Sequence, residues 1–238
     1  MKLFIIRHGD PDYEHDTLTE RGWQEAALLR QRLLREDLTK VYLSPLGRAK
    51  DTAKPFLEAS GMQADIRDFL REFPPVIEEP LSRFGMEDRV SCPWDMDPAL
   101  FHAKQAIFSD AAHWMEDPLI TAHGVGEYAR MVQDRFYDLL AENGLIRDGT
   151  AFRPDPAFDK ETIDRANIAV ICHMGLGSLL LATLAQMSPI QFWQMFRTMP
   201  TSVSTVLFRE IEGGRLQPKI FQVGDTTHLE PIGITYHI

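Results

Sequence analysis

The chain opens with the segment KLFIIRHG, residues 2–9, and the rest of its organisation is best understood from there. Leu3 to Ile6 form a short apolar run, which is typical of a strand buried inside a sheet. The charged pair Arg7 and His8 follows the run at once, and Gly9 then lets the backbone turn. The sequence therefore predicts a buried first strand whose carboxyl end carries an arginine and a histidine.

Strands and helices alternate along the first sixty or so residues. Thr19 is placed to cap a helix that extends to about Arg35, and the apolar run at residues 41–43 predicts another buried strand. Ser44 and the proline after it resemble the start of a helix that Gly61 ends. Such alternation implies a mainly parallel sheet with helices packed on it. We therefore expect an α/β fold, a three-layer αβα sandwich with helices on both faces of the sheet.

The second half of the chain alternates in the same way after an irregular segment. Residues 78–123 contain several prolines and scattered aromatic side chains without a clean period, so we expect a partly helical insertion within a single domain of residues 1–238. The remaining predicted elements are a helix at 125–143, a surface loop at 147–165, a strand at 168–172, a helix at 176–187, and a hairpin of strands 203–208 and 219–223.

The composition is that of an ordinary globular protein, with 44% apolar residues and a formal net charge of −10 over 238 residues. This charge argues against a general affinity for nucleic acid, and no apolar run approaches the length that crosses a bilayer. We expect no nucleic-acid or membrane partner and a cytoplasmic location, because the opening apolar run is too short for a signal-peptide core. Cys92 and Cys172 have no zinc-type spacing, so neither a metal nor another cofactor is expected. A homodimer stays open.

Charged or titratable residues follow three of the predicted strands. Arg7 and His8 follow the first strand, Arg48 lies in the first turn of the helix after the second, and His173 follows the strand at 168–172. Ligands of open parallel sheets bind at the carboxyl ends of the strands, so these residues are expected to meet. Guanidinium groups match phosphate oxygens, and a neutral imidazole can attack phosphorus, so the set suits phosphoryl transfer. The arginines would also help to keep His8 neutral.

Several segments extend this pattern. They are RHG at 7–9, LTERGWQEA at 18–26, SPLGRAKDTA at 44–53, CH at 172–173 and GDTTHL at 224–229. In this order they resemble the motifs of the histidine phosphatase (phosphoglycerate mutase-like) superfamily, over about residues 1–75 and 165–230. The resemblance implies chemistry on a phosphorylated substrate that passes through a phosphohistidine and needs no metal.

The resemblance also implies a role for each site residue. His8 would be the phosphorylated histidine, and Arg7, Arg48 and His173 would form the phosphate pocket around it. His173 thus counts both as a catalytic and as a phosphate-binding residue. The family's proton donor is usually a glutamate after the second helix, in a segment similar to the Leu-Arg-Glu that ends at Glu72, which implies Glu72 as the general acid.

Two positions depart from the family pattern. The segment FPP at 73–75 stands where the family often has Gly-Trp-Glu-Gly, so Asp10, Glu78 and Glu79 are reserve candidates for the proton donor. Met174 replaces the first glycine of the usual His-Gly-Gly. This change leaves the histidine intact but is expected to alter how closely the loop backbone meets a phosphate.

Mutases and phosphatases of the family share the phosphate pocket and differ in its surroundings. The segment between Gly9 and Leu18 is short here and contains four acidic side chains. Carboxylates near the mouth would repel highly anionic bisphosphates, so hydrolysis of a small phosphomonoester, with water as the acceptor, is the leading function. A phosphoglycerate mutase-type transfer and a non-catalytic phospho-ligand binder on the same fold are the alternatives. The insertion at 78–123 is expected to cover the active site and to set specificity.

Overall fold

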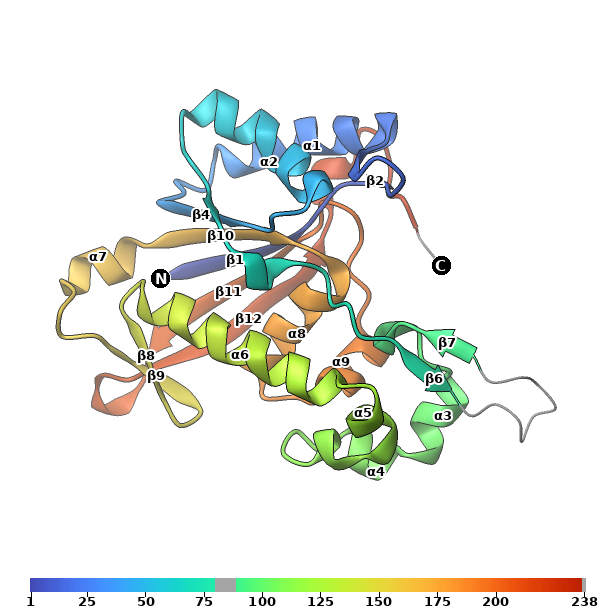
Figure 1. Cartoon of the computed structure of the whole chain (residues 1–238). Helices are drawn as coiled ribbons and strands as arrows, with labels where there is room; N and C mark the ends of the chain where they lie inside the picture. The colour runs from blue at the N-terminus through green and yellow to red at the C-terminus, as the bar shows by residue number, and fades with distance from the viewer. Residues whose placement is uncertain (80–88, 237–238) are drawn as a thin grey trace.

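A computed structural model describes residues 1–79 and 89–236 of the chain. The centre of this described part is an eight-stranded sheet with the order β5-β4-β10-β1-β11-β12-β9-β8 (Figure 1). Its strands are β1 (Lys2–Arg7), β4 (Lys40–Leu43), β5 (Asp65–Ile66), β8 (Leu145–Asp148), β9 (Ala151–Pro154), β10 (Asn167–Cys172), β11 (Val203–Glu210) and β12 (Leu216–Asp225). A separate two-stranded ladder joins β2 (Pro11–Asp12) to β3 (Thr17–Leu18).

The sheet changes its pairing at β1. The strands β5, β4, β10 and β1 pair in parallel, with Ile5 opposite Val170 in the β1–β10 register. From β1 through β11, β12 and β9 to β8 each pairing is antiparallel. All of these strands except β11 and β9 therefore run in one direction, which confirms a mainly parallel orientation, although the pairing is mixed. The predicted closing hairpin is confirmed as β11 and β12.

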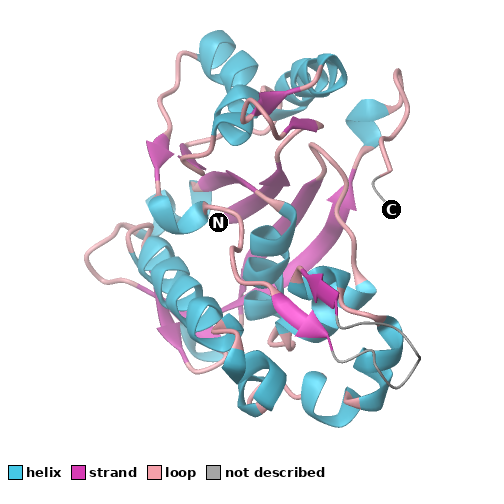
Figure 2. Ribbon diagram, turned by 45° about the vertical axis from the view of Figure 1, so that its right-hand side comes forward, coloured by secondary structure: helices cyan, strands magenta, loops and turns pink. Residues whose placement is uncertain are grey.

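Helices cover both faces of the sheet, as the alternation predicted (Figures 1 and 2). Phe4 and Ile6 of β1 pack into a core with α1 (Glu20–Leu33) and α2 (Gly47–Ser60). Leu3 and Ile5 point to the other face and join the core with α6 (Val125–Ala141) and α8 (Met174–Ala185). Because alternate side chains of β1 enter opposite cores, the strand is buried on both faces. The three-layer α/β class is confirmed.

The ends of the first two helices show which sequence signals were used. Thr19 caps α1 as predicted, and Gly61 ends α2 in the left-handed conformation with φ of 71°. The prediction that Ser44 caps the second helix is wrong, since α2 begins at Gly47. The carboxylate of Asp16 instead accepts the Gly47 N–H at 2.7 Å. A residue distant in sequence thus accepts a hydrogen bond from the helix N-terminus in place of Ser44. The serine hydroxyl is left for another contact.

The segment at 147–165 is not a loop throughout, as the sequence had indicated. It contains β9 and α7 (Lys160–Arg165), and β8 pairs with β9 at the edge of the sheet. Phe152 of β9 pairs with Leu216 of β12 and is buried, whereas most of its neighbours are exposed. A hairpin at a sheet edge exposes most of its side chains, so its polar sequence resembles that of a loop.

The insertion at 78–123 forms short elements beyond α9 (Pro189–Met195), and residues 80–88 of it lie outside the described part. Glu79 anchors it, because its buried carboxylate accepts hydrogen bonds from Arg89, from the Ser91 hydroxyl and from the backbone N–H of Asp97. Its elements are β6 (Ile77–Glu79), β7 (Arg89–Ser91), α3 (Pro98–Ala103), α4 (Gln105–Phe108) and α5 (Pro118–Ala122).

Candidate active site

His8 is the first residue after β1, and its backbone is held from two sides. Its N–H donates to the Cys172 carbonyl of β10 at 2.9 Å, and its carbonyl accepts the Thr201 N–H at 3.1 Å. The parallel pairing of β1 with β10 brings the residues that follow the two strands to the same edge of the sheet. The imidazole rings of His8 and His173 consequently lie 5.1 Å apart, centroid to centroid, in an edge-to-face arrangement.

The imidazole of His8 has a defined tautomer. Its Nδ1 lies 2.7 Å from the Gly9 carbonyl oxygen, and because a carbonyl only accepts, Nδ1 carries the proton in the neutral ring. Burial, together with the positive charges of Arg7 and Arg48, lowers the pKa of His8 to about 3. The ring is therefore neutral at physiological pH, and its Nε2 keeps a lone pair that can act as a nucleophile.

His173 is the residue before α8 and contacts the serine that does not cap α2. Its Nε2 lies 2.7 Å from Ser44 Oγ, which also accepts the Leu46 N–H. When the serine proton is donated to Nε2, the proton of the neutral imidazole is on Nδ1, which is buried and has no hydrogen-bond partner among the described residues. Burial is the main cause that lowers the pKa of His173 well below its ordinary value, and repulsion between its protonated form and a protonated His8, and from Arg48 and Arg7, adds to it.

The positive charges of Arg7 and Arg48 act on both imidazole rings, and the two residues are nearly buried, with exposures of 8% and 9%. Arg7 Nη1 donates to the Thr198 carbonyl at 2.6 Å, and Arg48 Nη1 donates to the Asp16 carboxylate at 2.7 Å. The Nε atom of each arginine is buried and has no hydrogen-bond partner in the described part of the chain. Buried donors without acceptors are rare, so these groups and His173 Nδ1 together indicate an anion site.

Glu72 lies against the first turn of α8, which His173 precedes. Its carboxylate accepts three backbone N–H groups, from Leu176 at 2.9 Å, from Phe73 at 2.8 Å and from Gly175 at 3.2 Å. Burial raises the pKa of Glu72 above its ordinary value, against the opposing effect of these donors. A carboxyl group with a raised pKa next to a phosphate site has the property that a general acid needs.

Of the two positions after His173, it is Gly175, in the first turn of α8, that has no room for a side chain. Met174 begins α8 and is not among the residues with a left-handed backbone, so a side chain fits at that position. Gly175 faces the indole of Trp94 in the insertion, and a Cβ there would lie 2.0 Å from Trp94 Cζ3. The insertion therefore packs directly on the first turn of α8. The effect of Met174 on how closely the backbone meets a phosphate stays a prediction.

The reserve carboxylates have other contacts. Asp10 accepts the Thr19 hydroxyl at 2.5 Å, and Glu78 is exposed on β6. Glu79 is buried in the insertion hairpin, where it binds Arg89. Of these candidates, Glu72 is the one that contacts α8 beside His173.

Sequence reasoning missed the polar residues that position the predicted ones. Thr52 accepts the Gly9 N–H at 2.9 Å and donates to the Arg48 carbonyl at 2.7 Å. Glu25 is completely buried and accepts the backbone N–H of the residue after Gly9. Ser44 orients His173. All three lie inside the quoted motif segments, and this was the only signal available for them.

Within residues 1–79 and 89–236, no three His, Cys, Asp or Glu side chains gather in a group that could hold a metal ion. None of the helices in that part has the length and apolarity needed to span a bilayer.

A comparison with models of protein families finds a match over the first part of the chain. The model of the histidine phosphatase superfamily (branch 1) matches residues 3–83, a segment that includes Arg7, His8, Arg48 and Glu72. This first third of the chain is similar to the histidine phosphatase superfamily. The resemblance seen in the sequence is thereby confirmed, while the roles of the individual residues stay predictions.

Relatives within the superfamily are similar over limited segments. The chain is 40% identical to a probable phosphatase of Schizosaccharomyces pombe, over 24% of this chain and 32% of that protein. It is 28% identical to a probable phosphoglycerate mutase of Photorhabdus laumondii, over 30% of this chain and 38% of that protein. The matches thus span about a third of the length of these curated relatives. A crystal structure of phosphoserine phosphatase from Entamoeba histolytica with phosphoserine has a TM-score of 0.61 at 20% identity, covering 96% of this chain and 98% of that one, and so shares the fold.

We expect the free energy of unfolding to decrease as the pH is lowered from 7 towards 4. Burial is the main cause that lowers the pKa of His8 to about 3 and of His228 to about 4, and that of His173 well below its ordinary value. Below pH 6.5 the unfolded chain binds protons that the folded chain does not, which costs up to about 1.4 kcal/mol per pH unit for each histidine. The raised pKa of Glu72 acts in the opposite sense, because the folded state keeps a proton that the unfolded state has released.

Urea unfolding at pH 7, 6 and 5 measures this dependence. His173→Asn should flatten the slope of stability against pH, and His15→Asn, at an exposed position, reports the effect of losing a histidine at the surface. Equal stability of the wild-type protein at pH 7 and pH 5 would contradict the expectation.

Proposed function

We propose that this protein is a metal-independent phosphatase that hydrolyses phosphomonoesters through a phosphohistidine on His8. The observation that carries the proposal is that the unprotonated Nε2 of His8 lies among buried donors. These donors, on Arg7, Arg48 and His173, have no acceptor among the described residues. A phosphoryl group supplies three equatorial oxygens to such donors while its phosphorus meets the nucleophile. The similarity to a protein named as a probable phosphatase also supports hydrolysis.

In the first step, the lone pair of His8 Nε2 attacks phosphorus, and the bond between phosphorus and the leaving oxygen breaks. The proton of Glu72 passes to that oxygen, so the product leaves as a neutral alcohol. The Gly9 carbonyl holds the Nδ1 proton of the ring and stabilises the positive charge that develops on the imidazole. Arg7 and Arg48 bind the non-bridging oxygens, whose charge is greatest in the transition state.

In the second step, a water molecule attacks the phosphorus of the phosphohistidine. The carboxylate of Glu72 takes a proton from the water, the bond between phosphorus and His8 Nε2 breaks, and inorganic phosphate is released. His8 returns to its neutral form with the proton still on Nδ1, and Glu72 returns to its protonated form. The cycle thus needs one nucleophile and one group that acts first as acid and then as base.

The acidic segment between Gly9 and Leu18 favours water as the acceptor of the phosphoryl group, but not all of its carboxylates act by repulsion. Asp16 is not a free repulsive charge, because it binds Arg48 and the Gly47 N–H, and these contacts overcome burial to lower its pKa. Asp12 binds His15. The acidic loop therefore also serves to orient Arg48. The similarity to a named phosphoglycerate mutase keeps phosphoryl transfer as the second candidate.

The insertion and the cellular setting belong to the same proposal. The packing of Trp94 on Gly175 supports a role for the insertion as a cover over the Glu72 side of the site, within a single domain of residues 1–238. We further infer a cytoplasmic enzyme whose partner is a small phosphorylated substrate. Nucleic acid and membranes are not expected as partners, and a homodimer is an open alternative.

Phosphate release from a panel of phosphomonoesters in the presence of EDTA tests the function. We expect turnover with the chelator present and no transfer of the phosphoryl group to a second substrate. Interconversion of 2-phosphoglycerate and 3-phosphoglycerate without phosphate release would favour the mutase. Binding of inorganic phosphate without turnover of any ester would favour the non-catalytic binder.

A further inference from the structure

Glu25 lies on the core-facing side of α1, among small and apolar side chains. The buried residues of this helix are Gly22, Glu25, Ala26, Leu29 and Leu33, and Glu25 is completely buried. Removal of a carboxylate from water is costly unless hydrogen bonds or an opposite charge compensate for it. A carboxylate at this position is therefore kept at a cost in the free energy of folding.

The contacts of the Glu25 carboxylate are those of an ionised group. Its Oε2 accepts the backbone N–H of Asp10 at 2.9 Å. Its Oε1 accepts the Thr235 hydroxyl at 2.8 Å and lies 3.4 Å from Arg21 Nε. A backbone N–H and a guanidinium can only donate, so a carboxylate that accepts at both oxygens suits these contacts. Glu25 thus places a buried negative charge against the backbone that follows Gly9.

A single peptide group separates this carboxylate from the imidazole of His8. The N–H of Asp10 and the carbonyl of Gly9 belong to the same peptide group, and the carbonyl oxygen lies 2.7 Å from His8 Nδ1. Because the peptide is trans, its C=O and N–H point in opposite directions, one toward the ring and the other toward α1. Hydrogen bonds in such a chain polarise one another, so the carboxylate of Glu25 makes the Gly9 carbonyl a stronger acceptor.

Two glycines let α1 approach this peptide closely. Gly22 lies one turn before Glu25, and a Cβ at Gly22 would lie 2.2 Å from the Asp10 carbonyl oxygen. A Cβ at Gly9 would lie 3.0 Å from the Gly22 carbonyl oxygen. Side chains at these positions would push the helix away from the strand end, and Glu25 would then not reach the Asp10 N–H.

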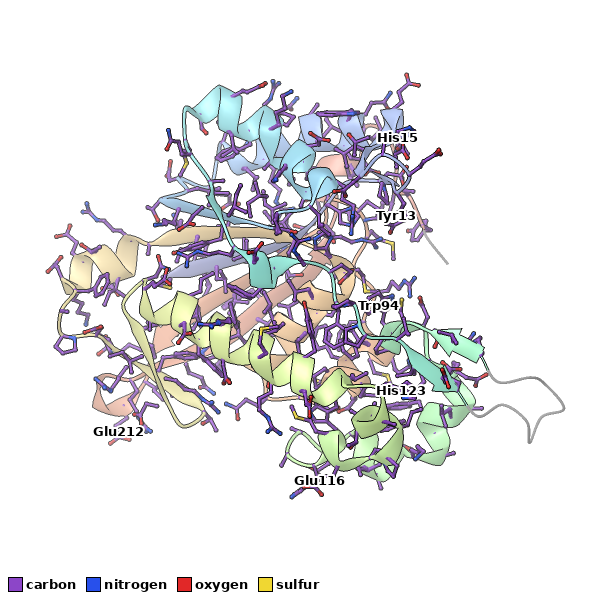
Figure 3. All side chains as sticks on the ribbon, viewed as in Figure 1. Tyr13, His15, Trp94, Glu116, His123 and Glu212 are labelled. Atoms are coloured by element: carbon purple, nitrogen blue, oxygen red, sulfur yellow. The ribbon has the colours of Figure 1, made fainter. Side chains whose placement is uncertain are left out.

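Side chains further along the segment after Gly9 face the solvent instead. Tyr13 and His15 lie on the outer side of this segment in Figure 3, and both are exposed. The carboxylate of Asp12 is held there by His15, at 2.8 Å. Glu25 approaches from the inner side, where water does not compete for its charge.

We propose that Glu25 is a positioning residue that acts through the Gly9–Asp10 peptide to make His8 a better nucleophile. The proposal rests on the phosphatase function and adds a residue to its mechanism. As His8 Nε2 forms its bond to phosphorus, positive charge develops on the ring, and the carbonyl that Glu25 polarises stabilises this charge. No proton reaches Glu25: the Nδ1 proton stays on the ring, and the carboxylate accepts the Asp10 N–H throughout.

The Glu25→Gln variant tests the proposal, because glutamine keeps the shape of the side chain and an oxygen for the Asp10 N–H but removes the charge. We expect kcat/KM for ethyl phosphate, which reports the attack of His8, to fall about 10-fold, the difference between a charged and a neutral hydrogen-bond partner. The inhibition constant of inorganic phosphate should not rise, because removal of a negative charge does not weaken the binding of an anion. Glu20→Gln, at an exposed glutamate of the same helix, is the matched control and should keep the wild-type values.

Proton NMR of the resting enzyme gives a readout that does not depend on turnover. The His8 Nδ1–H resonance, assigned by its loss in His8→Ala, should move upfield in Glu25→Gln because the Gly9 carbonyl becomes a weaker acceptor. Arg21→Gln removes the positive charge beside Glu25 and should move the same resonance downfield. The Arg21 side chain is 30% exposed, so this variant tests the sign even where Glu25→Gln does not fold.

The two readouts separate polarisation of the peptide from a merely structural contact. If kcat/KM of Glu25→Gln equals that of the wild type, or if the phosphate inhibition constant rises as far as kcat/KM falls, Glu25 acts only in packing and the proposal is overturned. An Nδ1–H resonance that stays in place in both variants overturns it as well, and these results in an active enzyme leave the phosphatase function intact. Resonances that move as expected in a protein that hydrolyses no ester support the link between Glu25 and His8 and refute the phosphatase.

Discussion

The His8→Ala variant should lose both turnover and covalent labelling by the substrate. Removal of a nucleophile from a hydrolase that forms a covalent intermediate costs on the order of 10⁶ in kcat, and no second imidazole with a free lone pair is aimed at the site in the proposed mechanism. Rapid acid-free quenching followed by intact-protein mass spectrometry measures the phosphoryl adduct, and phosphate release measures turnover.

His228→Asn is the matched control for this experiment. His228 also has a pKa lowered to about 4, mainly by burial, but it contacts the Thr201 hydroxyl rather than the cluster of arginines. We expect this variant to keep both the adduct and most of the activity. Full activity of His8→Ala would remove the nucleophile assignment, whereas an adduct that persists on another residue would move it.

The Glu72→Gln variant should distinguish substrates by their leaving groups. Alkyl phosphates need a proton on the departing oxygen, so their kcat should fall by about 10²–10⁴, whereas an aryl phosphate with a good leaving group should lose little. Glutamine keeps an oxygen that can accept the Leu176 or Gly175 N–H, so the start of α8 should be preserved. Phosphate release from ethyl phosphate and p-nitrophenyl phosphate gives the two rates.

The pH profile adds a second readout on Glu72. Because its pKa is raised and the protonated form is the acid, turnover of alkyl phosphates should decrease as the pH rises through that pKa, and this limb should disappear in Glu72→Gln. Glu78→Gln, at an exposed glutamate nearby, should behave like the wild type. Equal losses of Glu72→Gln on both substrate types would point to another proton donor.

The sequence was sufficient for the core of the site because strand ends are local signals. A short apolar run followed by Arg7 and His8, and another followed by His173, predict adjacent strand ends once the sheet is known to be parallel. The position of Arg48 in the first turn after the second predicted strand added that residue, and the resemblance to the family supplied Glu72. In the structure these residues do lie together around the edge of β1 and β10, or against α8.

Contacts between segments that are distant in the sequence could not be predicted from local patterns. The hydroxyl of Ser44 had an equally good local explanation as a helix cap, and only the fold shows that Asp16 takes that place. Trp94 comes from a segment without periodicity, so nothing local indicated that it approaches α8. The edge hairpin of β8 and β9 was missed because half-exposed strands and loops have similar compositions.

The position of β1 has a consequence for how the protein is made. This strand lies between β10 and β11, and both neighbours come from the last third of the chain. A ribosome adds about 5–20 residues per second, so the apolar face of β1 waits roughly 10–40 s for its partners to be synthesised. During that time the nascent chain exposes an unpaired strand with a high tendency to aggregate, and His8 acquires its environment only when synthesis is nearly complete. Shielding by a chaperone early in translation should therefore determine how much active protein a cell obtains.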